Sequence, residues 1–174
     1  GLRVIIVGAD VGMMGGTASH EFMAFSENGE DTILFCNQCG YAANREVAKF
    51  KRDQPGQEAA LPVEEIETPD TTTIQALADL LGIPTSKTAK AVFFKGGSGR
   101  FIFAVIRGDL DVNETTLRNA TGERTITPAT VEEIRAVGAE PGYGSPVGVH
   151  DAFIVVDESV RDTPNLVAGA NRIG

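Results

Sequence analysis

The chain has 174 residues, of which 42% are hydrophobic and 22% charged, so its composition excludes disordered and fibrous proteins. Its net charge of -9 at pH 7 argues against a protein whose whole surface binds nucleic acid, and it leaves room for a local basic pocket. No apolar run approaches the roughly 18 residues of a membrane-spanning helix, so we expect no membrane span.

The first 51 residues predict part of an antiparallel sheet. Short apolar runs at 2–7, 21–25 and 32–36 are typical of strands, and the glycine-bearing segment 27–31 suits a hairpin connection. Residues 41–51 have helical character. We expect these strands to need partners that the chain lacks. The chain begins with neither Met nor a charged leader, which we interpret as a cut inside a longer protein.

Residues 52–69 contain three prolines and scattered acidic residues, and we interpret them as a linker. From residue 70 onward, helical and strand patterns alternate, which favours an α/β (α+β) domain with a mixed β-sheet and flanking helices. The expected helices span 74–81, ended by Gly82, then 113–119 and 128–137, and the expected strands span 91–95, 100–107 and 152–157.

Cys36 and Cys39 form a CxxC pair. Three interpretations stay open: reduced thiols beside a strand end, a redox pair, or half of a metal site. A four-ligand zinc site needs two further ligands, and the only histidines, His20 and His150, are not in a ligand-pair spacing. We therefore expect no metal site.

Lys90 lies at the entrance of the strand expected at 91–95, where alternation puts its side chain on the same face as Val92 and Phe94. A cation beside apolar neighbours is costly unless it meets an anion, and a phosphate of an RNA 3′ end would satisfy it. The alternative is a surface lysine whose stem covers apolar groups while the ammonium stays in water.

Residues 141–148 hold three glycines and two prolines. Such a loop exposes backbone N–H groups that can hold a carbonyl oxygen as it becomes an oxyanion; a tight turn is the alternative. Asn171 follows small residues and could orient a substrate or cap a turn. The sequence shows no convincing Ser-His-Asp or Cys-His grouping, so hydrolysis would depend on a positioned water, oxyanion stabilisation and help from the substrate's own hydroxyl.

Several motifs resemble bacterial prolyl-tRNA synthetases. In the first part these are Gly-Gly-Thr-Ala-Ser-His-Glu-Phe-Met at 15–23, Gly-Glu-Asp at 29–31 and Cys-Asn-Gln-Cys-Gly-Tyr-Ala-Ala-Asn at 36–44. In that family this stretch belongs to the class II catalytic core, and an editing insertion follows it. The matching insertion motifs here are Lys-Thr-Ala-Lys at 87–90, Arg-Gly-Asp at 107–109, Asn113-Glu114, the GxxxP loop at 142–146 and Gly-Ala-Asn at 169–171.

The resemblance implies three parts: a class II core fragment (1–51), a linker (52–69) and a YbaK-like editing domain (70–174). The last part would be a cis-editing aminoacyl-tRNA deacylase that removes alanine wrongly attached to proline tRNA. By this resemblance, Lys90 matches the lysine that engages the tRNA end. The carbonyl-holding loop matches Gly142, Tyr143, Gly144, Ser145 and Pro146, and the substrate-binding candidates are Lys87, Gly169 and Asn171, with His20 and Glu21 near the proline pocket of the core.

The implied partners are the alanine-carrying acceptor end of tRNA(Pro) and the rest of the synthetase chain, in a homodimeric, cytoplasmic parent enzyme. Editing would need no cofactor, whereas ATP with Mg would serve only the full-length synthetase, so we expect no aminoacylation by this chain alone. The family pattern continues beyond Asn171 to a histidine that helps fit alanine, and the sequence ends before it. The alternative function is a non-catalytic module that binds the tRNA acceptor or supports the synthetase structurally.

Overall fold

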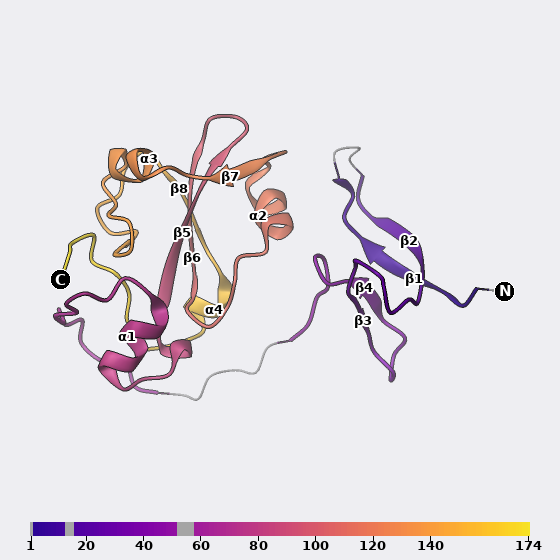
Figure 1. The fold of residues 1–174 in the computed structure, drawn as a ribbon, viewed down its shortest axis with the longest axis horizontal. Helices are drawn as coiled ribbons and strands as arrows, with labels where there is room; N and C mark the ends of the chain where they lie inside the picture. The colour runs from indigo at the N-terminus through magenta and orange to yellow at the C-terminus, as the bar shows by residue number, and fades with distance from the viewer. Residues whose placement is uncertain (1, 13–15, 52–57) are drawn as a thin grey trace. The chain divides into compact units, whose positions relative to one another are not determined.

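The computed structural model describes residues 2–12, 16–51 and 58–174. The chain forms two compact units, Gly1–Arg52 with Asn113–Arg124, and Asp53–Val112 with Thr125–Gly174. Each unit contains its own four-stranded sheet (Figure 1). Within the part of the chain that the structure describes, no helix is both long and apolar enough to cross a membrane.

The first unit is built from two β-hairpins. β1 (Val4–Ala9) pairs with β2 (Ser19–Ala24), and β3 (Ile33–Phe35) pairs with β4 (Ala42–Asn44), both antiparallel. The hairpin expected at 27–31 is wrong, because this segment joins β2 to β3, which lie at opposite edges of the sheet. A parallel pairing of β1 with β4 joins the hairpins, so the sheet, in the order β2-β1-β4-β3, is mixed. Helix α2 (Glu114–Thr121) belongs to this unit.

The prediction of a helix over residues 41–51 is wrong. Residues 42–44 form β4, and only a single turn follows, in which Val47 N and Ala48 N both donate to Asn44 O at 3.0 Å. Short-range helical character is overridden here because β4 supplies the pairing partner of both β3 and β1.

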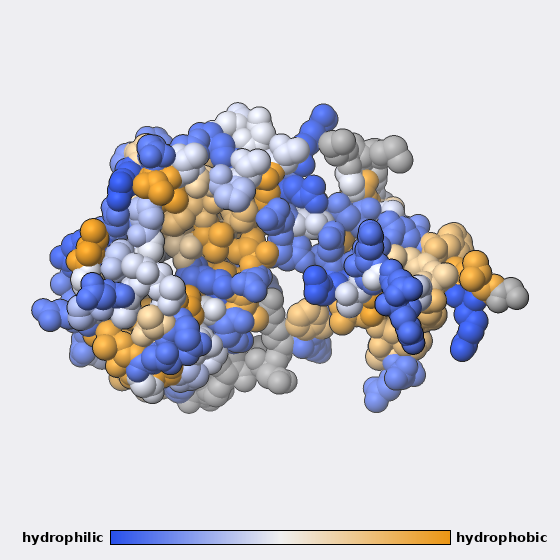
Figure 2. All heavy atoms as spheres, viewed as in Figure 1, coloured by the Kyte–Doolittle hydropathy of each residue, from blue (hydrophilic) through white to orange (hydrophobic). Residues whose placement is uncertain are grey.

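One face of the first sheet carries exposed apolar side chains. Ile6 pairs with Phe22 in the register and Val4 pairs with Ala24, so these residues share a face, and Val4, Ile6 and Phe22 are all exposed. Figure 2 shows apolar side chains gathered at the surface of this unit. Exposed apolar faces are common where proteins interact with partners.

The second unit contains a sheet in the order β7-β5-β6-β8, formed by Ile126–Pro128, Ala89–Gly96, Phe101–Arg107 and Phe153–Val156. β5 pairs antiparallel with β6 and β7, whereas β6 pairs parallel with β8. Residues 101–106 are all buried, as expected for a strand covered on both faces. The mixed α/β fold class predicted from the sequence is confirmed.

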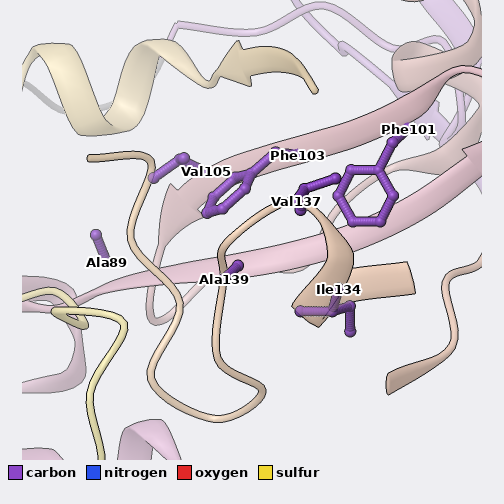
Figure 3. Close-up of a cluster of buried hydrophobic side chains, with 7 residues drawn as sticks. All are labelled: Ala89, Phe101, Phe103, Val105, Ile134, Val137 and Ala139. Carbon is purple, nitrogen blue, oxygen red and sulfur yellow. The ribbon is translucent and has the colours of Figure 1, made fainter. Parts of the chain in front are cut away.

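One cluster of the core lies on a single face of this sheet. Buried side chains from β5 and β6 meet those of α3 (Val131–Ala136) and the residues after it (Figure 3). The Phe93 ring packs edge-on against Phe103, with ring centroids 4.8 Å apart. The cluster consists of Ala89, Phe101, Phe103, Val105, Ile134, Val137 and Ala139.

The ends of two helices are set by capping residues and by strand pairing. In α1 (Ile74–Leu81), the Thr73 side chain accepts from Ala76 N at 3.2 Å, and Gly82 ends the helix with φ 64°, as predicted. Helix α3 exists but starts three residues later than predicted, because Pro128 pairs with Phe94 in β7. A proline suits this edge strand, since it has no N–H to donate.

Two short helical segments, η2 (Thr85–Lys87) and α4 (Glu158–Arg161), complete the described elements and were not predicted. The predicted boundaries at 51, 69 and 70 stay predictions. Part of the predicted linker, residues 52–57, lies outside the described residues, and residues 58–69 contain no helix or strand.

Candidate active site

The entrance of β5 is held by the Arg-Gly-Asp motif. Gly108 N donates to Thr88 O at 2.7 Å, and a methyl group at Gly108 would lie 1.9 Å from Thr88 Oγ1, so only glycine permits this approach. Arg107 forms a two-pronged ion pair with Asp109, with Nε–Oδ1 at 2.6 Å and Nη2–Oδ2 at 2.9 Å. Hydrogen bonding to Asp109 raises the pKa of Arg107. The motif thus fixes the backbone that presents Lys90.

Lys90 has a carboxylate partner in this structure. Its Nζ lies 2.8 Å from Oδ1 of Asp111, and its side chain is 24% exposed, whereas that of Asp111 is fully exposed. The hydrogen bond from Lys90 lowers the pKa of Asp111. An exposed carboxylate holds this cation weakly, because water competes for both groups. An incoming phosphate could therefore replace Asp111.

The glycine loop, residues 142–146, packs directly on β5. A methyl group at Gly144 would lie 2.7 Å from the Phe93 ring and 2.8 Å from Ala91 Cβ, so the loop backbone touches these side chains. Gly142 has φ 83°, a left-handed conformation that favours glycine. Both glycines are therefore required by the path of the loop.

Asn171 braces this loop through its side-chain amide. Oδ1 accepts from Ser145 N at 2.8 Å, and Nδ2 donates to Ser145 O at 2.9 Å and to Val147 O at 3.0 Å. Its backbone N donates to Tyr143 O at 2.8 Å. Asn171 itself has φ 55°, which asparagine tolerates well. The geometry makes Asn171 a positioning residue for the loop.

Gly169 contacts the other side of the same turn. A methyl group there would lie 2.2 Å from Tyr143 O and 2.7 Å from Gly144 O, which are backbone atoms that cannot rotate away. The structure therefore brings together the glycine loop and the Gly-Ala-Asn motif at 169–171, two features that the sequence analysis selected separately.

The loop leaves two backbone donors for a ligand. Tyr143 N donates to Glu140 O at 3.0 Å, and Ser145 N is bound by Asn171. Among the described residues, no acceptor is found for the N–H groups of Gly142 and Gly144. Backbone N–H donors that point at one position can stabilise a developing oxyanion.

Lys90 lies on the opposite face of β5 from the loop. The loop touches Ala91 and Phe93, and successive side chains of a strand point to opposite faces. β7 pairs with Phe94–Gly96 and Val167 pairs with Thr88, so among the described residues only the edge of β5 from Lys90 to Val92 has no strand partner. A ligand that reaches both Lys90 and the loop must pass over this edge.

The remaining sequence-predicted residues lie elsewhere. His20 and Glu21 are exposed on β2 of the first unit, where they pair with Gly8 and Val7. His150 is exposed and donates its backbone N to Val137 O at 3.1 Å, which is a structural role. Lys87 lies 2.5 Å from Glu58 and also donates to Pro164 O at 3.2 Å.

The two cysteines lie in the turn between β3 and β4, and both are free thiols. Cys36 N donates to Tyr41 O and Gly40 N donates to Cys36 O, which closes the turn. Hydrogen bonds from the backbone of Cys39 and Gln38 lower the pKa of the Cys36 thiol. Within the described ranges, no group of three or more His, Cys, Asp or Glu side chains could hold a metal ion.

Sequence reasoning missed the segment that contacts Lys87. Asn165, in a left-handed conformation with φ 57°, binds residues of the expected linker through its side chain. A polar residue in an unusual conformation leaves a weak sequence signal, because asparagine is common in ordinary turns.

Comparison with known proteins defines the class of this site. Residues 68–174 match the family model described as the aminoacyl-tRNA editing domain. The chain belongs to this family of editing domains.

The similarity to curated proteins extends over the first unit as well. The chain is 48% identical to a proline–tRNA ligase of Salinispora tropica and 44% identical to one of Dehalococcoides mccartyi, in both cases over 100% of its length. It is 39% identical to a proline–tRNA ligase of Thermotoga maritima over 97% of its length. The chain spans only 31%, 30% and 29% of these three relatives. The resemblance to prolyl-tRNA synthetases is thus confirmed.

Among solved structures, one described as a candidate trans-editing enzyme for prolyl-tRNA synthetase aligns with a TM-score of 0.49 and 24% identity. The alignment covers 55% of this chain and 61% of that protein.

Proposed function

We propose that this chain is part of a proline–tRNA ligase and that its second unit hydrolyses alanyl-tRNA(Pro). Membership of the editing-domain family supports the reaction class, and the relatives' name supports the tRNA. The observation that carries the proposal is the braced glycine loop, in which the N–H groups of Gly142 and Gly144 have no acceptor among the described residues.

In the proposed reaction, a water oxygen adds to the ester carbonyl that joins alanine to the terminal ribose. Negative charge develops on the carbonyl oxygen, and the N–H groups of Gly142 and Gly144 stabilise it. The bond to the ribose oxygen then breaks, and that oxygen takes the proton that the attacking water gives up, so the products are alanine and a free ribose hydroxyl. In this proposal a positioned water, with help from the neighbouring ribose hydroxyl, takes the place of a side-chain nucleophile.

Lys90 would bind a phosphate of the acceptor end in place of Asp111. A phosphate accepts strong charge-assisted hydrogen bonds from an ammonium group. Because Lys90 and the loop lie on opposite faces of β5, the single-stranded end would cross the strand edge between Lys90 and Val92, which has no strand partner among the described residues, to place its ester at the loop.

Selection of alanine over proline would follow from size. A site shaped for a small side chain rejects a bulkier one by steric clash, whereas a larger site cannot strongly reject a smaller ligand. The acceptor end of tRNA(Pro), the remainder of the synthetase chain and a dimeric, cytoplasmic parent enzyme belong to this proposal. Editing itself requires no cofactor, and ATP with Mg would serve only the full-length synthetase.

The test is deacylation of alanyl-tRNA(Pro) by the wild-type chain and by Lys90→Ala, with Lys95→Ala as the matched control. Lys95 lies on the same strand and pairs with Glu133 at 3.5 Å, so its removal changes charge equally without touching the proposed path. We expect loss of activity in Lys90→Ala only. Tight binding of an uncharged acceptor stem without any hydrolysis would instead support a non-catalytic binding module.

A further inference from the structure

An acidic segment lies against two cations beside the candidate site. Residues 58–67, named here the acidic strap, contain four glutamates and no basic residue. Glu58 Oε2 lies 2.5 Å from Lys87 Nζ, and Glu65 Oε1 lies 2.6 Å from Arg172 Nη2. All of these residues belong to the second unit.

The two cations adjoin the segments that form the candidate site. Lys87 begins the Lys-Thr-Ala-Lys motif that ends at Lys90, and Arg172 directly follows Asn171. The two segments are hydrogen-bonded to each other, because Val167 N donates to Lys87 O at 2.9 Å. The acidic strap therefore contacts both segments through their basic side chains.

The backbone of the acidic strap is hydrogen-bonded to the side chain of Asn165. The side-chain Oδ1 of Asn165 accepts from Leu61 N at 2.9 Å, and its Nδ2 donates to Ala59 O at 3.0 Å. Asn165 holds a left-handed conformation, φ 57°. This pair of bonds to the strap backbone fixes its path without involving its apolar side chains.

Burial contributes little to this attachment. Leu61 is 68% exposed, Val63 is fully exposed at 102% and Ile66 is 49% exposed. The strap is held by hydrogen bonds, by the exposed ion pair of Arg172 with Glu65 and by the half-buried ion pair of Lys87 with Glu58. Water and salt weaken exposed contacts of this kind. A competing anion can therefore replace the strap carboxylates with only a small loss of binding free energy.

We propose that Lys87 and Arg172 form a phosphate-contact site for the acceptor end of tRNA, and that Glu58 and Glu65 of the acidic strap occupy it when no RNA is bound. Carboxylate and phosphate oxygens satisfy the same donors, and arginine binds either group with its planar fork. The inference rests on the proposed function, since it assigns these cations to the same RNA that the glycine loop would act on.

Competition by the acidic strap has a consequence for specificity. Any polyanion must displace Glu58 and Glu65 before it reaches the cations. Only an RNA end that also contacts Lys90 and the glycine loop gains enough binding free energy to offset the loss of these two ion pairs. The strap therefore lowers the affinity for unrelated polyanions more than it lowers that for the substrate.

The test is fluorescence anisotropy with a labelled RNA hairpin that carries the acceptor stem and its single-stranded 3′ end, at low ionic strength. The 174-residue chain with Glu58→Gln and Glu65→Gln is compared with the chain carrying Glu64→Gln and Glu67→Gln. Glu64 and Glu67 are exposed strap residues for which the described residues supply no ion pair, so both double variants change the net charge equally. We expect the first variant to bind about fourfold or more tightly than the second.

A second pair of variants makes the result specific. Lys87→Ala with Arg172→Ala should reduce the slope of log affinity against log salt by about 1.4, since a single strand contributes about 0.7 per neutralised phosphate. In that background, Glu58→Gln with Glu65→Gln should give no gain. Equal affinities of the two glutamine variants, or a gain that persists without the cations, would overturn the proposal.

Deacylation of alanyl-tRNA(Pro), measured on the same samples, separates this proposal from the proposed function. If the wild-type chain hydrolyses the ester and the two glutamine variants bind RNA equally, the strap inference alone is refuted. If no variant hydrolyses the ester and Glu58→Gln with Glu65→Gln still strengthens RNA binding, the proposed function is refuted and the phosphate-contact site is supported.

Discussion

The brace formed by Asn171 can be tested by a single-atom change. Asn171→Asp keeps the acceptor for Ser145 N but places a carboxylate oxygen against the carbonyls of Ser145 and Val147, where the amide donates at 2.9 Å and 3.0 Å. Two hydrogen bonds at roughly 0.5–1.5 kcal/mol each are lost, so we expect unfolding free energy to fall by about 2 kcal/mol. For a domain of this size, that corresponds to a decrease in Tm of about 8 °C.

The sign of the pH dependence follows from the same two carbonyls. They favour the protonated carboxyl, which can donate to one of them, so the pKa of the new group is higher in the folded chain than in the unfolded chain. Above the raised pKa the variant carries its full destabilisation, and as pH falls through that pKa the destabilisation decreases. The difference in Tm from wild type should therefore narrow between pH 7 and pH 5.

Thermal unfolding followed by circular dichroism measures both effects, and alanyl-tRNA(Pro) deacylation at pH 7 reports on the loop. Asn28→Asp, the same change at an exposed position of the first unit, serves as the control and should leave Tm nearly unchanged. A wild-type Tm for Asn171→Asp at pH 7, or a difference that widens on acidification, would refute the reasoning.

Three further predictions concern single positions. Gly169→Ala should lower the deacylation rate about 100-fold, because its methyl group would displace the Tyr143 carbonyl. The control Gly8→Ala, whose methyl group lies at least 3.7 Å from any neighbour, should retain activity. Equal activities of the two variants would contradict this prediction. Thr130→Ala removes the capping box of α3 and should cost about 1 kcal/mol in denaturant unfolding, and an unchanged midpoint would argue against the cap. In Lys90→Ala, the NMR-measured pKa of Asp111 should rise toward its ordinary value, and a pKa that stays low would show that another group holds it.

Much of the fold could be predicted because its signals are local. The helix at α1 is defined by its apolar spacing, by the Thr73 cap and by Gly82, all within ten residues. The β5–β6 hairpin follows from two apolar runs around a glycine-rich turn, in which Gly99 has φ 89°. The segment at 41–51 failed because pairing with distant strands, rather than local character, determines β4.

The sequence predicted which residues form the candidate site, and it did not predict which of them contact one another. The glycine content of the loop at 142–146 indicates close backbone approach, and the structure shows contact with Phe93. That Asn171 binds Ser145, 26 residues away, depends on tertiary packing and has no sequence period. The same holds for the acidic strap, because a segment that looks like a linker is held by Asn165, more than a hundred residues later.

Strand alternation predicts which face of β5 carries Lys90, but it does not predict which face the loop covers. The loop's contact with Ala91 is needed to show that the two lie on opposite faces. Alternation correctly groups Lys90 with Val92, whereas the face chosen by the loop depends on packing. The sequence could therefore identify both features without showing that they lie on opposite faces of β5.

The most direct test of the account compares the rates at which the 174-residue chain hydrolyses alanyl-tRNA(Pro) and prolyl-tRNA(Pro) under single-turnover conditions. The account predicts rapid release of alanine and retention of proline. Equal rates for the two esters, or no hydrolysis of either by a folded chain, would contradict it.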